Sequence, residues 1–506
     1  MSSINLRAAA AAIILTASCA GASAQEAEGP MRDQFFWLGE INKASAVINS
    51  QEGLLDPALT PRIAQGIRTV LENGAAEGAK RPSTVISFEP LMIEAAGVEV
   101  TLLHAGRSSQ DMHATYRAAI LRDRLLELAE ELNTTTRTLV ELADQHQGTI
   151  VPNYTNGVAA QPNSYGHYLL GHVAGLERDA QRIREAYARI DRSAMGTTVL
   201  NGTSWPLNRE RMADYLGFAS TVDNAYDASQ ISSTEHPVEV GALVTSIALH
   251  AGHFVEDVMV QYAQPRPWIL LQEGGGNTYV SSAMPQKRNP GILNDARGAA
   301  STAIATAFGP VLRAHNITPG QNDAKDVSAN NEVIDNAVEV LQAWNEIAGA
   351  LAIDPERALE ELDSDWTASQ EVADILMREH GLPFRAGHHF ASEIVDFAKA
   401  ENIRPSEFPY AEAQRIYAES LGDMDLPSDE LPMSEEEFRN ALDPQVIIAN
   451  RASAGGPQPA EMTRMLEAAR GALDRQDAWV RERREHIDAS LARLGADFED
   501  LMAEAD

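Results

Sequence analysis

A short polar loop, residues 281–290, brings a hydroxyl, a cation and an amide together in the second half of the chain. An enzyme that removes a proton beside a carboxylate needs a base, and it must also neutralise the doubly charged enolate-like intermediate that results. Ser281 could be this base and Lys287 the neutralising cation. A surface turn with Pro285 and Pro290 in it is the structural alternative. The loop therefore indicates a carbanion-forming lyase.

The glycine run just before this loop, Gly274-Gly275-Gly276, gives the backbone unusual freedom. Such a hinge could let the loop open for substrate and close over it. The run lacks the Lys-Ser/Thr pair of a phosphate-binding loop and the strand that should precede one. Nucleotide binding is therefore not expected.

The N-terminal segment, residues 1–24, reads as a secretory signal peptide. It carries one positive charge at Arg7, an apolar run from Ala8 to Ala17 that is too short to span a bilayer, and the small residues Ala22-Ser23-Ala24 before Gln25. Cleavage after Ala24 would remove Cys19, the single cysteine, and a chain without thiols suits an oxidising periplasm. Lipidation at Cys19 is one alternative, and a cytoplasmic protein is another.

The strongly acidic composition limits the partners of this chain. The formal net charge is -33 and the sequence pI is about 4.7, so the long-range field repels nucleic acid and anionic membrane surfaces. Solubility in a salty habitat explains the charge better than a specific basic partner does. We expect no nucleic-acid partner, and no membrane partner unless Cys19 is lipidated.

Helical periodicity dominates the chain, and alternating strand patterns are nearly absent. Five long helices are predicted, over residues 112–147, 167–191, 238–262, 296–312 and 330–353. Five such helices indicate a bundle. The chain divides into predicted domains at 25–111, 112–380 and 381–506, with an acidic insertion at 401–437 interpreted as a loop. The apolar seams beginning at Leu121, Leu169 and Val238 are too long for one chain to cover, which predicts a homotetramer.

Two further polar segments precede the first two long helices, at residues 104–111 and 154–162. With the Ser281 loop, they fall at opposite ends of long helices. A single chain could hardly bring all three together. In an antiparallel tetramer, however, helix ends from different subunits meet, and one site can be assembled from three chains.

These segments together carry a family resemblance. The pattern Ser281-Ser282-x-Met284-Pro285-x-Lys287-x-Asn289 resembles the signature loop of the fumarase/aspartase superfamily. Residues 104–108, 205–211, 381–385 and 454–456 further resemble argininosuccinate lyase, and the resemblance runs from about residue 85 to about residue 470.

The resemblance implies a mainly α fold, with a central bundle of twenty helices in the tetramer and two smaller helical end domains. It implies anti elimination from an N-substituted aspartate, releasing fumarate and an amine or guanidine, with no metal and no organic cofactor. By this resemblance Ser281 and Lys287 are catalytic, and the small carboxylate substrate is bound by Ser108, Ser109, Gln110, Thr155, Asn156, Gln161, Ser282, Met284, Asn289 and Asn322.

The chain departs from that family where substrate is bound. Ser109, Asn156 and Asp323 stand where the family has an arginine, a histidine and an arginine. Asn cannot act as an acid or base near neutral pH, and each lost charge-assisted bond to a carboxylate is worth about 1.5–3 kcal/mol. These changes predict a substrate whose amine side carries no carboxylate of its own. A non-catalytic descendant of the fold, or a carbon–oxygen lyase or cycloisomerase of the same superfamily, are the alternative functions.

Overall fold

A computed structural model describes residues 32–316, 318–320, 330–421 and 428–503. The predicted signal peptide at 1–24, with Cys19, lies outside the described residues, and so does the predicted substrate contact Asn322.

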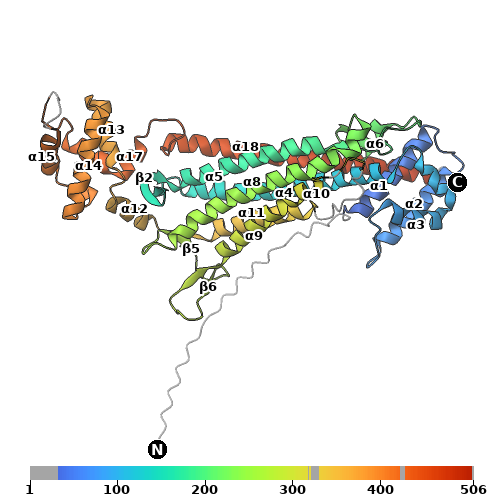
Figure 1. The fold of residues 1–506 in the computed structure, drawn as a ribbon, viewed down its shortest axis with the longest axis horizontal. Coiled ribbons are helices and arrows are strands. Elements are labelled where there is room, and N and C mark those ends of the chain that lie inside the picture. The colour runs from blue at the N-terminus through green and yellow to red at the C-terminus, as the bar shows by residue number, and fades with distance from the viewer. Residues whose placement is uncertain (1–31, 317, 321–329, 422–427, 504–506) are drawn as a thin grey trace, which may run out of the picture.

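Three helices form one end of the molecule (Figure 1): α1 (Gln34–Gln51), α2 (Thr60–Ala75) and α3 (Val85–Ala96), followed by the short 3₁₀ helix η1 (Val98–His104). Asp33 caps α1 by accepting a hydrogen bond from the backbone N–H of Phe36 at 2.9 Å. Trp37, Leu38 and Ile41 of α1 are almost completely buried. This end unit is thus anchored by the apolar face of α1.

The centre of the molecule is a bundle of long helices, as the sequence predicts. Its helices are α4 (Ser109–Gln145), α5 (Tyr165–Ile190), α8 (Ser232–Gln261), α9 (Gly291–Ala307) and α11 (Glu332–Ala350). The short helices α6 (Arg209–Tyr215) and α7 (Ala225–Gln230) lie in the connection from α5 to α8. The predicted helix 296–312 is instead broken at Phe308, after which α10 (Gly309–Ala314) begins. Pro310 explains the break, because proline has no backbone N–H to continue the first helix.

The strands within the described residues are short and pair only two by two. β1 (Ile150–Thr155) and β2 (Val158–Ser164) form an antiparallel hairpin, as do β6 (Thr278–Val280) and β7 (Arg288–Pro290). β3 (Arg192–Ser193) pairs in parallel with β4 (Ser220–Thr221), and β5 (Ile269–Leu271) pairs antiparallel with β8 (Leu351–Ile353). The β6–β7 hairpin projects from the side of the bundle in Figure 1.

The opposite end of the molecule is a second helical unit with its own apolar core (Figure 1). Its helices, in order, are α12 (Pro355–Ser364), α13 (Ser369–His380), α14 (Phe384–Glu401), η4 (Pro405–Glu407), α15 (Tyr410–Leu421), α16 (Glu435–Leu442) and α17 (Pro444–Ala449). The interpretation of 401–437 as a loop is therefore wrong. Ala413, Ile416 and Tyr417 give α15 a buried face, although acidic residues surround them.

The predicted C-terminal domain, 381–506, also needs correction. The second core already includes Trp366, Val372 and Leu376, so this unit begins before residue 381. The last helix, α18 (Pro459–Ala503), leaves the unit and packs along α4, α5 and α1. Its buried residues, including Leu466 and Leu494, belong to the main core, because their apolar face is covered by the bundle.

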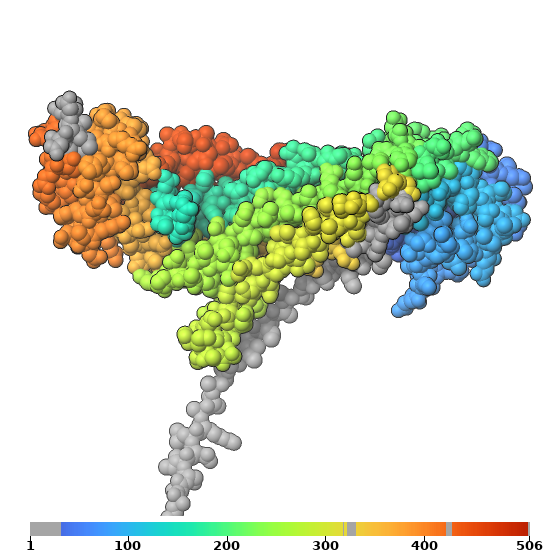
Figure 2. Space-filling model, viewed as in Figure 1, coloured from blue at the N-terminus to red at the C-terminus, as the bar shows by residue number. Residues whose placement is uncertain are grey.

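The apolar seams on which the tetramer prediction rested are covered within one chain. Leu121 is 5% exposed, Leu169 is fully buried, and the α8 seam is likewise filled by other helices. A different apolar surface remains open on α8, α9 and α10, where these side chains are exposed: Leu249, Val260, Ile304, Phe308 and Leu312. α8 is long and apolar enough to cross a membrane, but half of that stretch is buried against other helices. These helices cross the face shown in Figure 2.

Candidate active site

The β6–β7 hairpin holds five of the predicted site residues: Ser281, Ser282, Met284, Lys287 and Asn289. Register pairs join Thr278 to Pro290 and Val280 to Arg288, so the loop between them is closed at its base. Within the loop, the backbone N–H of Ser281 donates to the carbonyl of Lys287 at 3.2 Å. The predicted base and the predicted cation are therefore fixed on opposite sides of one tight loop.

The hydroxyl oxygen of Ser281 is a hydrogen-bond acceptor. Its Oγ accepts from the backbone N–H of Met284 at 3.2 Å and from that of Ala283 at 3.4 Å. Hydrogen bonds donated to an oxygen stabilise its deprotonated, negatively charged form. The loop backbone thus favours the state that a serine base requires.

Lys287 and Asn289 lie on the far side of the same loop. Lys287 is exposed, and it forms no ion pair with any residue in the described part of the chain. Its neighbour Arg288 pairs instead with Glu273 at 3.2 Å. The Nδ2 of Asn289 donates to the carbonyl of Tyr279 at 3.3 Å. Lys287 therefore keeps its charge available for a ligand.

The glycines before the hairpin adopt conformations that other residues avoid. Gly274, Gly275 and Gly276 have φ angles of 91°, 61° and 93°. A side chain at Gly274 or Gly276 would meet no atom within 4 Å, so the requirement for glycine comes from the backbone alone. This geometry fits the predicted hinge.

A second group of predicted residues marks the start of α4. The Oγ of Ser108 caps the helix and accepts from the backbone N–H of Gln110 at 3.4 Å, and Ser109 is partly buried in the first turn. Gln110 is 1% exposed, and its amide has no hydrogen-bond partner among the described residues. Gln110 thus lies beneath the surface of the single chain, whereas Ser108 and Ser109 are partly exposed at that surface.

Asp111 is a buried residue beside the predicted contacts Ser108, Ser109 and Gln110, and it was not among the predicted site residues. Its Oδ1 accepts from the backbone N–H of Ser108 at 2.7 Å, and its Oδ2 accepts from Gly196 and Thr198 at 3.0 and 3.1 Å. Burial raises the pKa of this carboxyl group, and the three backbone hydrogen bonds oppose the shift. The capping-box spacing of Ser108 and Asp111 was the available signal. Asp111 fixes the 196–198 loop beside the start of α4.

The third group lies on the β1–β2 hairpin. Thr155 ends β1, and Asn156 and Gly157 form the turn with φ angles of 52° and 77°. Asn-Gly is the preferred pair for two-residue hairpin turns with positive φ. Turn geometry therefore gives a structural reason for asparagine at this position. Gln161 of β2 donates to the side chain of Gln370 at 2.9 Å.

One chain does not bring these three groups together. The 37 residues of α4 span about 55 Å, and they separate Ser108 from the β1–β2 hairpin. In Figure 1 the β1–β2 hairpin and the start of α4 lie toward opposite ends, and the β6–β7 hairpin projects from the side. This is the arrangement that the sequence predicts for a site shared between chains.

Comparisons with known proteins agree with this architecture. A family described as "Lyase" matches residues 63–304, and one described as "Argininosuccinate lyase C-terminal" matches residues 366–449. Argininosuccinate lyase 2 of Agrobacterium fabrum is 28% identical over 472 residues, with 90% of each chain covered. Argininosuccinate lyase of Methanothrix thermoacetophila is 27% identical over 469 residues, covering 92% of this chain and 93% of the relative.

Solved structures show the same fold. A variant of EDDS lyase with bound fumarate has a TM-score of 0.83 at 23% identity, covering 93% of this chain and 92% of that one. Class II fumarase from Schistosoma mansoni has a TM-score of 0.60 at 15% identity, covering 81% of this chain and 90% of that one. The long bundle and the two end units are therefore those of the fumarase/aspartase fold.

The fold and the family matches together define the chain as a member of the fumarase/aspartase superfamily. Within that superfamily it is a lyase of the carbon–nitrogen type, related to argininosuccinate lyases.

Proposed function

We propose that this protein cleaves the carbon–nitrogen bond of an N-substituted aspartate and releases fumarate and an amine or guanidine. The observation that carries the proposal is the pair of backbone N–H groups directed at the Oγ of Ser281. A free serine hydroxyl is too weak a base, and these donors stabilise the alkoxide that would remove the proton. Similarity to argininosuccinate lyases supports the choice of substrate class.

The reaction uses the loop in two steps. Ser281 takes a proton from the carbon beside a carboxylate, and the resulting negative charge spreads onto that carboxylate. Lys287 neutralises this charge, which is greatest in the intermediate, and the side-chain amide of Asn289 donates a hydrogen bond to the same carboxylate. The electron pair then forms the carbon–carbon double bond as the carbon–nitrogen bond breaks, and the nitrogen is protonated as it leaves. Asn156 cannot donate that proton, so another group or water supplies it.

We place the working site in a homotetramer. The exposed apolar side chains on α8, α9 and α10 support this proposal, because a group of large apolar side chains left open to water on neighbouring helices is typical of an interaction surface. A second copy of the same bundle face would cover them, and it would bring helix ends from different chains together. Light scattering should show a tetramer, and a stable monomer at micromolar concentration would contradict both the assembly and the shared site.

The experiment that tests the function is a screen of N-substituted aspartates and malate-like acids, followed by the ultraviolet absorbance of fumarate. Wild-type protein should release fumarate from at least one N-substituted aspartate, and Ser281→Ala should not. Matched folding of the two proteins, checked by circular dichroism, makes the comparison valid. A folded tetramer that releases fumarate from none of the compounds would favour a non-catalytic descendant. Release from a malate-like acid alone would favour a carbon–oxygen lyase.

A further inference from the structure

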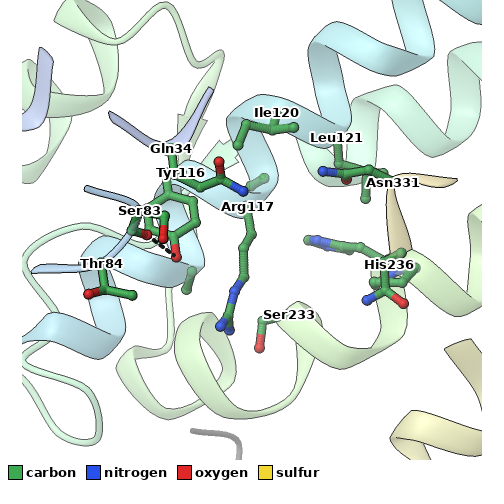
Figure 3. Close-up of a pocket in the computed structure, with 14 residues that line it drawn as sticks. Gln34, Ser83, Thr84, Tyr116, Arg117, Ile120, Leu121, Ser233, His236 and Asn331 are labelled. Carbon is green, nitrogen blue, oxygen red and sulfur yellow. Dashed lines mark hydrogen bonds between the residues drawn. The ribbon is translucent and has the colours of Figure 1, made fainter. Parts of the chain in front are cut away.

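A cavity of about 240 Å³ lies where the N-terminal end unit meets the bundle (Figure 3). Arg117 of α4 extends into it, between Ser83 and Thr84 on one side and His236 on the other in this view. Asn331 borders the same space from the start of α11. Residues from four separated parts of the chain therefore converge on one arginine.

The charges around this cavity are unusual for so acidic a chain. The whole sequence has 73 Asp and Glu against 40 Lys and Arg, yet the described residues that line the cavity include no carboxylate, and Arg117 is their only Lys or Arg. The next arginines of α4, Arg122 and Arg124, each pair with a carboxylate. Arg117 has no such pair within the described part of the chain. Among the described residues, the cavity lining thus carries one positive charge and no carboxylate.

Three helices add to this positive potential. Thr84 is the N-cap of α3, Ser233 lies in the first turn of α8, and Asn331 is the N-cap of α11. Helix N-termini carry partial positive charge and unpaired N–H groups. Glu235, Glu332 and Asp335 lie in the first turns of two of these helices, but none of them lines the cavity.

His236 completes the polar lining as a neutral group. Burial lowers the pKa of His236 to about 4, so its ring is uncharged near pH 7 and has one N–H to donate. It repels neither an anion nor a cation by charge. Selectivity in the cavity therefore comes from Arg117.

We propose that this cavity binds a carboxylate on the amine side of the substrate, with Arg117 as its charge partner and as the specificity-determining residue. The inference rests on the proposed lyase function. Ser109, His113 and Arg117 follow one another at steps of four residues along α4. The cavity at Arg117 therefore lies further along the same helix that carries the predicted substrate contact Ser109. Because Ser109 and Asp323 stand where the family has arginines, the sequence predicted a substrate without a carboxylate on its amine side. Arg117 reverses that expectation.

The test runs the reaction in the direction of carbon–nitrogen bond formation, from fumarate and an amine donor. Donors are compared in matched pairs with and without a carboxylate: β-alanine against ethylamine, and γ-aminobutyrate against propylamine. Consumption of fumarate absorbance gives kcat/KM for each. Wild type should prefer the acid of each pair by about tenfold to a hundredfold, the range of one charge-assisted bond. Arg117→Met should remove this preference, mainly through KM for the acid, and Arg117→Lys should restore part of it.

Arg124→Met is the matched control, because Arg124 lies on the same helix, outside the cavity, and pairs with Glu127 at 2.6 Å. It should keep the wild-type preference. Equal use of acid and amine by wild type, or an unchanged preference in Arg117→Met, would overturn the proposal.

The lyase proposal stands or falls with the screen of N-substituted aspartates. If none of these four donors reacts with fumarate, the cavity is tested without turnover, by calorimetric titration with β-alanine. Binding by wild type that is lost in Arg117→Met, but kept in Arg124→Met, would support a carboxylate site. Equal binding by wild type and Arg117→Met, or no binding by either, would refute it.

Discussion

Arg122 of α4 donates a hydrogen bond from Nη1 to Oδ1 of Asp191 at 2.9 Å, and both side chains are almost completely buried. The same guanidinium donates to the carbonyls of Gly217 and Leu216 at 2.7 and 3.2 Å, and it lies 4.3 Å from the ring centroid of Phe218. This pair ties the end of α5 and the 216–218 segment to the middle of the bundle.

Removal of the Asp191 carboxylate should therefore destabilise the folded protein strongly. Asp191→Ala leaves the Arg122 charge buried without its partner, and such a loss lowers the free energy of unfolding by about 3–5 kcal/mol. Urea denaturation followed by circular dichroism measures the change. Arg137→Gln is the control, because Arg137 pairs with Asp477 at 2.6 Å near the surface. Arg137→Gln should change the free energy of unfolding by no more than about 1 kcal/mol. A similar loss in both variants would contradict the special role of the buried pair.

Ser281→Ala and Lys287→Met should affect catalysis differently. Loss of a base that moves the proton lowers kcat by about 10²–10⁴-fold with little change in substrate binding. Lys287 neutralises a carboxylate in both substrate and intermediate, so Lys287→Met should raise KM and lower kcat together. Steady-state release of fumarate separates the two patterns. Arg288→Met removes the surface pair with Glu273 and the hydrogen bonds to the loop carbonyls of Pro285 and Lys287, so it is the control for loop structure with the Lys287 charge kept. Wild-type turnover by Ser281→Ala would exclude this serine as the base.

The glycine hinge gives a prediction about the backbone. Gly276 has a φ of 93°, and a Cβ at this position would meet no atom within 4 Å, so Gly276→Ala should cost about 1–2 kcal/mol through backbone strain alone. It should also slow turnover, because the loop that carries Ser281 starts from this hinge. Gly298→Ala in α9 is the matched control, since its site is equally open but helical, and it should be neutral or slightly stabilising. Unchanged turnover in Gly276→Ala would argue against a hinge.

Acid should destabilise the protein below neutral pH through buried histidines. Burial is the main cause that lowers the pKa of His113, His172 and His236 to about 4, against about 6.5 in an unfolded chain. Between these values the unfolded state binds more protons than the folded state, so stability falls as pH drops from about 6.5 to about 4. Thermal unfolding at a series of pH values measures this slope. His172→Phe, in the aromatic cluster with Tyr168 and Phe254, should make it shallower. An equal slope in wild type and variant would show that His172 does not contribute.

Export predicts a defined mature chain. If residues 1–24 are a cleaved signal peptide, mass spectrometry of the exported protein should show an N-terminus at Gln25 and no cysteine. A lipid on Cys19 would indicate the lipoprotein alternative, and an intact Met1 would indicate a protein that is not exported.

The sequence by itself determined the features that depend on short-range order. Ser281, Lys287 and Asn289 fall within nine residues, so any fold that forms this loop places them together. The long helices also follow from local pattern, because the 3.6-residue period is repeated over many turns. The family resemblance rests on the same local segments.

Only the tertiary structure decided which surfaces these helices bury and which residues from distant segments meet. The seams at Leu121 and Leu169 were expected to need other chains, but α18 and the neighbouring helices cover them, and the open surface lies on α8, α9 and α10. The meeting of Asp111 with Gly196, and of Arg117 with His236, could not be read from spacing. The periodicity of a segment shows which face of its helix is apolar and which is polar. Which residues that face contacts depends on how elements far apart in the sequence pack.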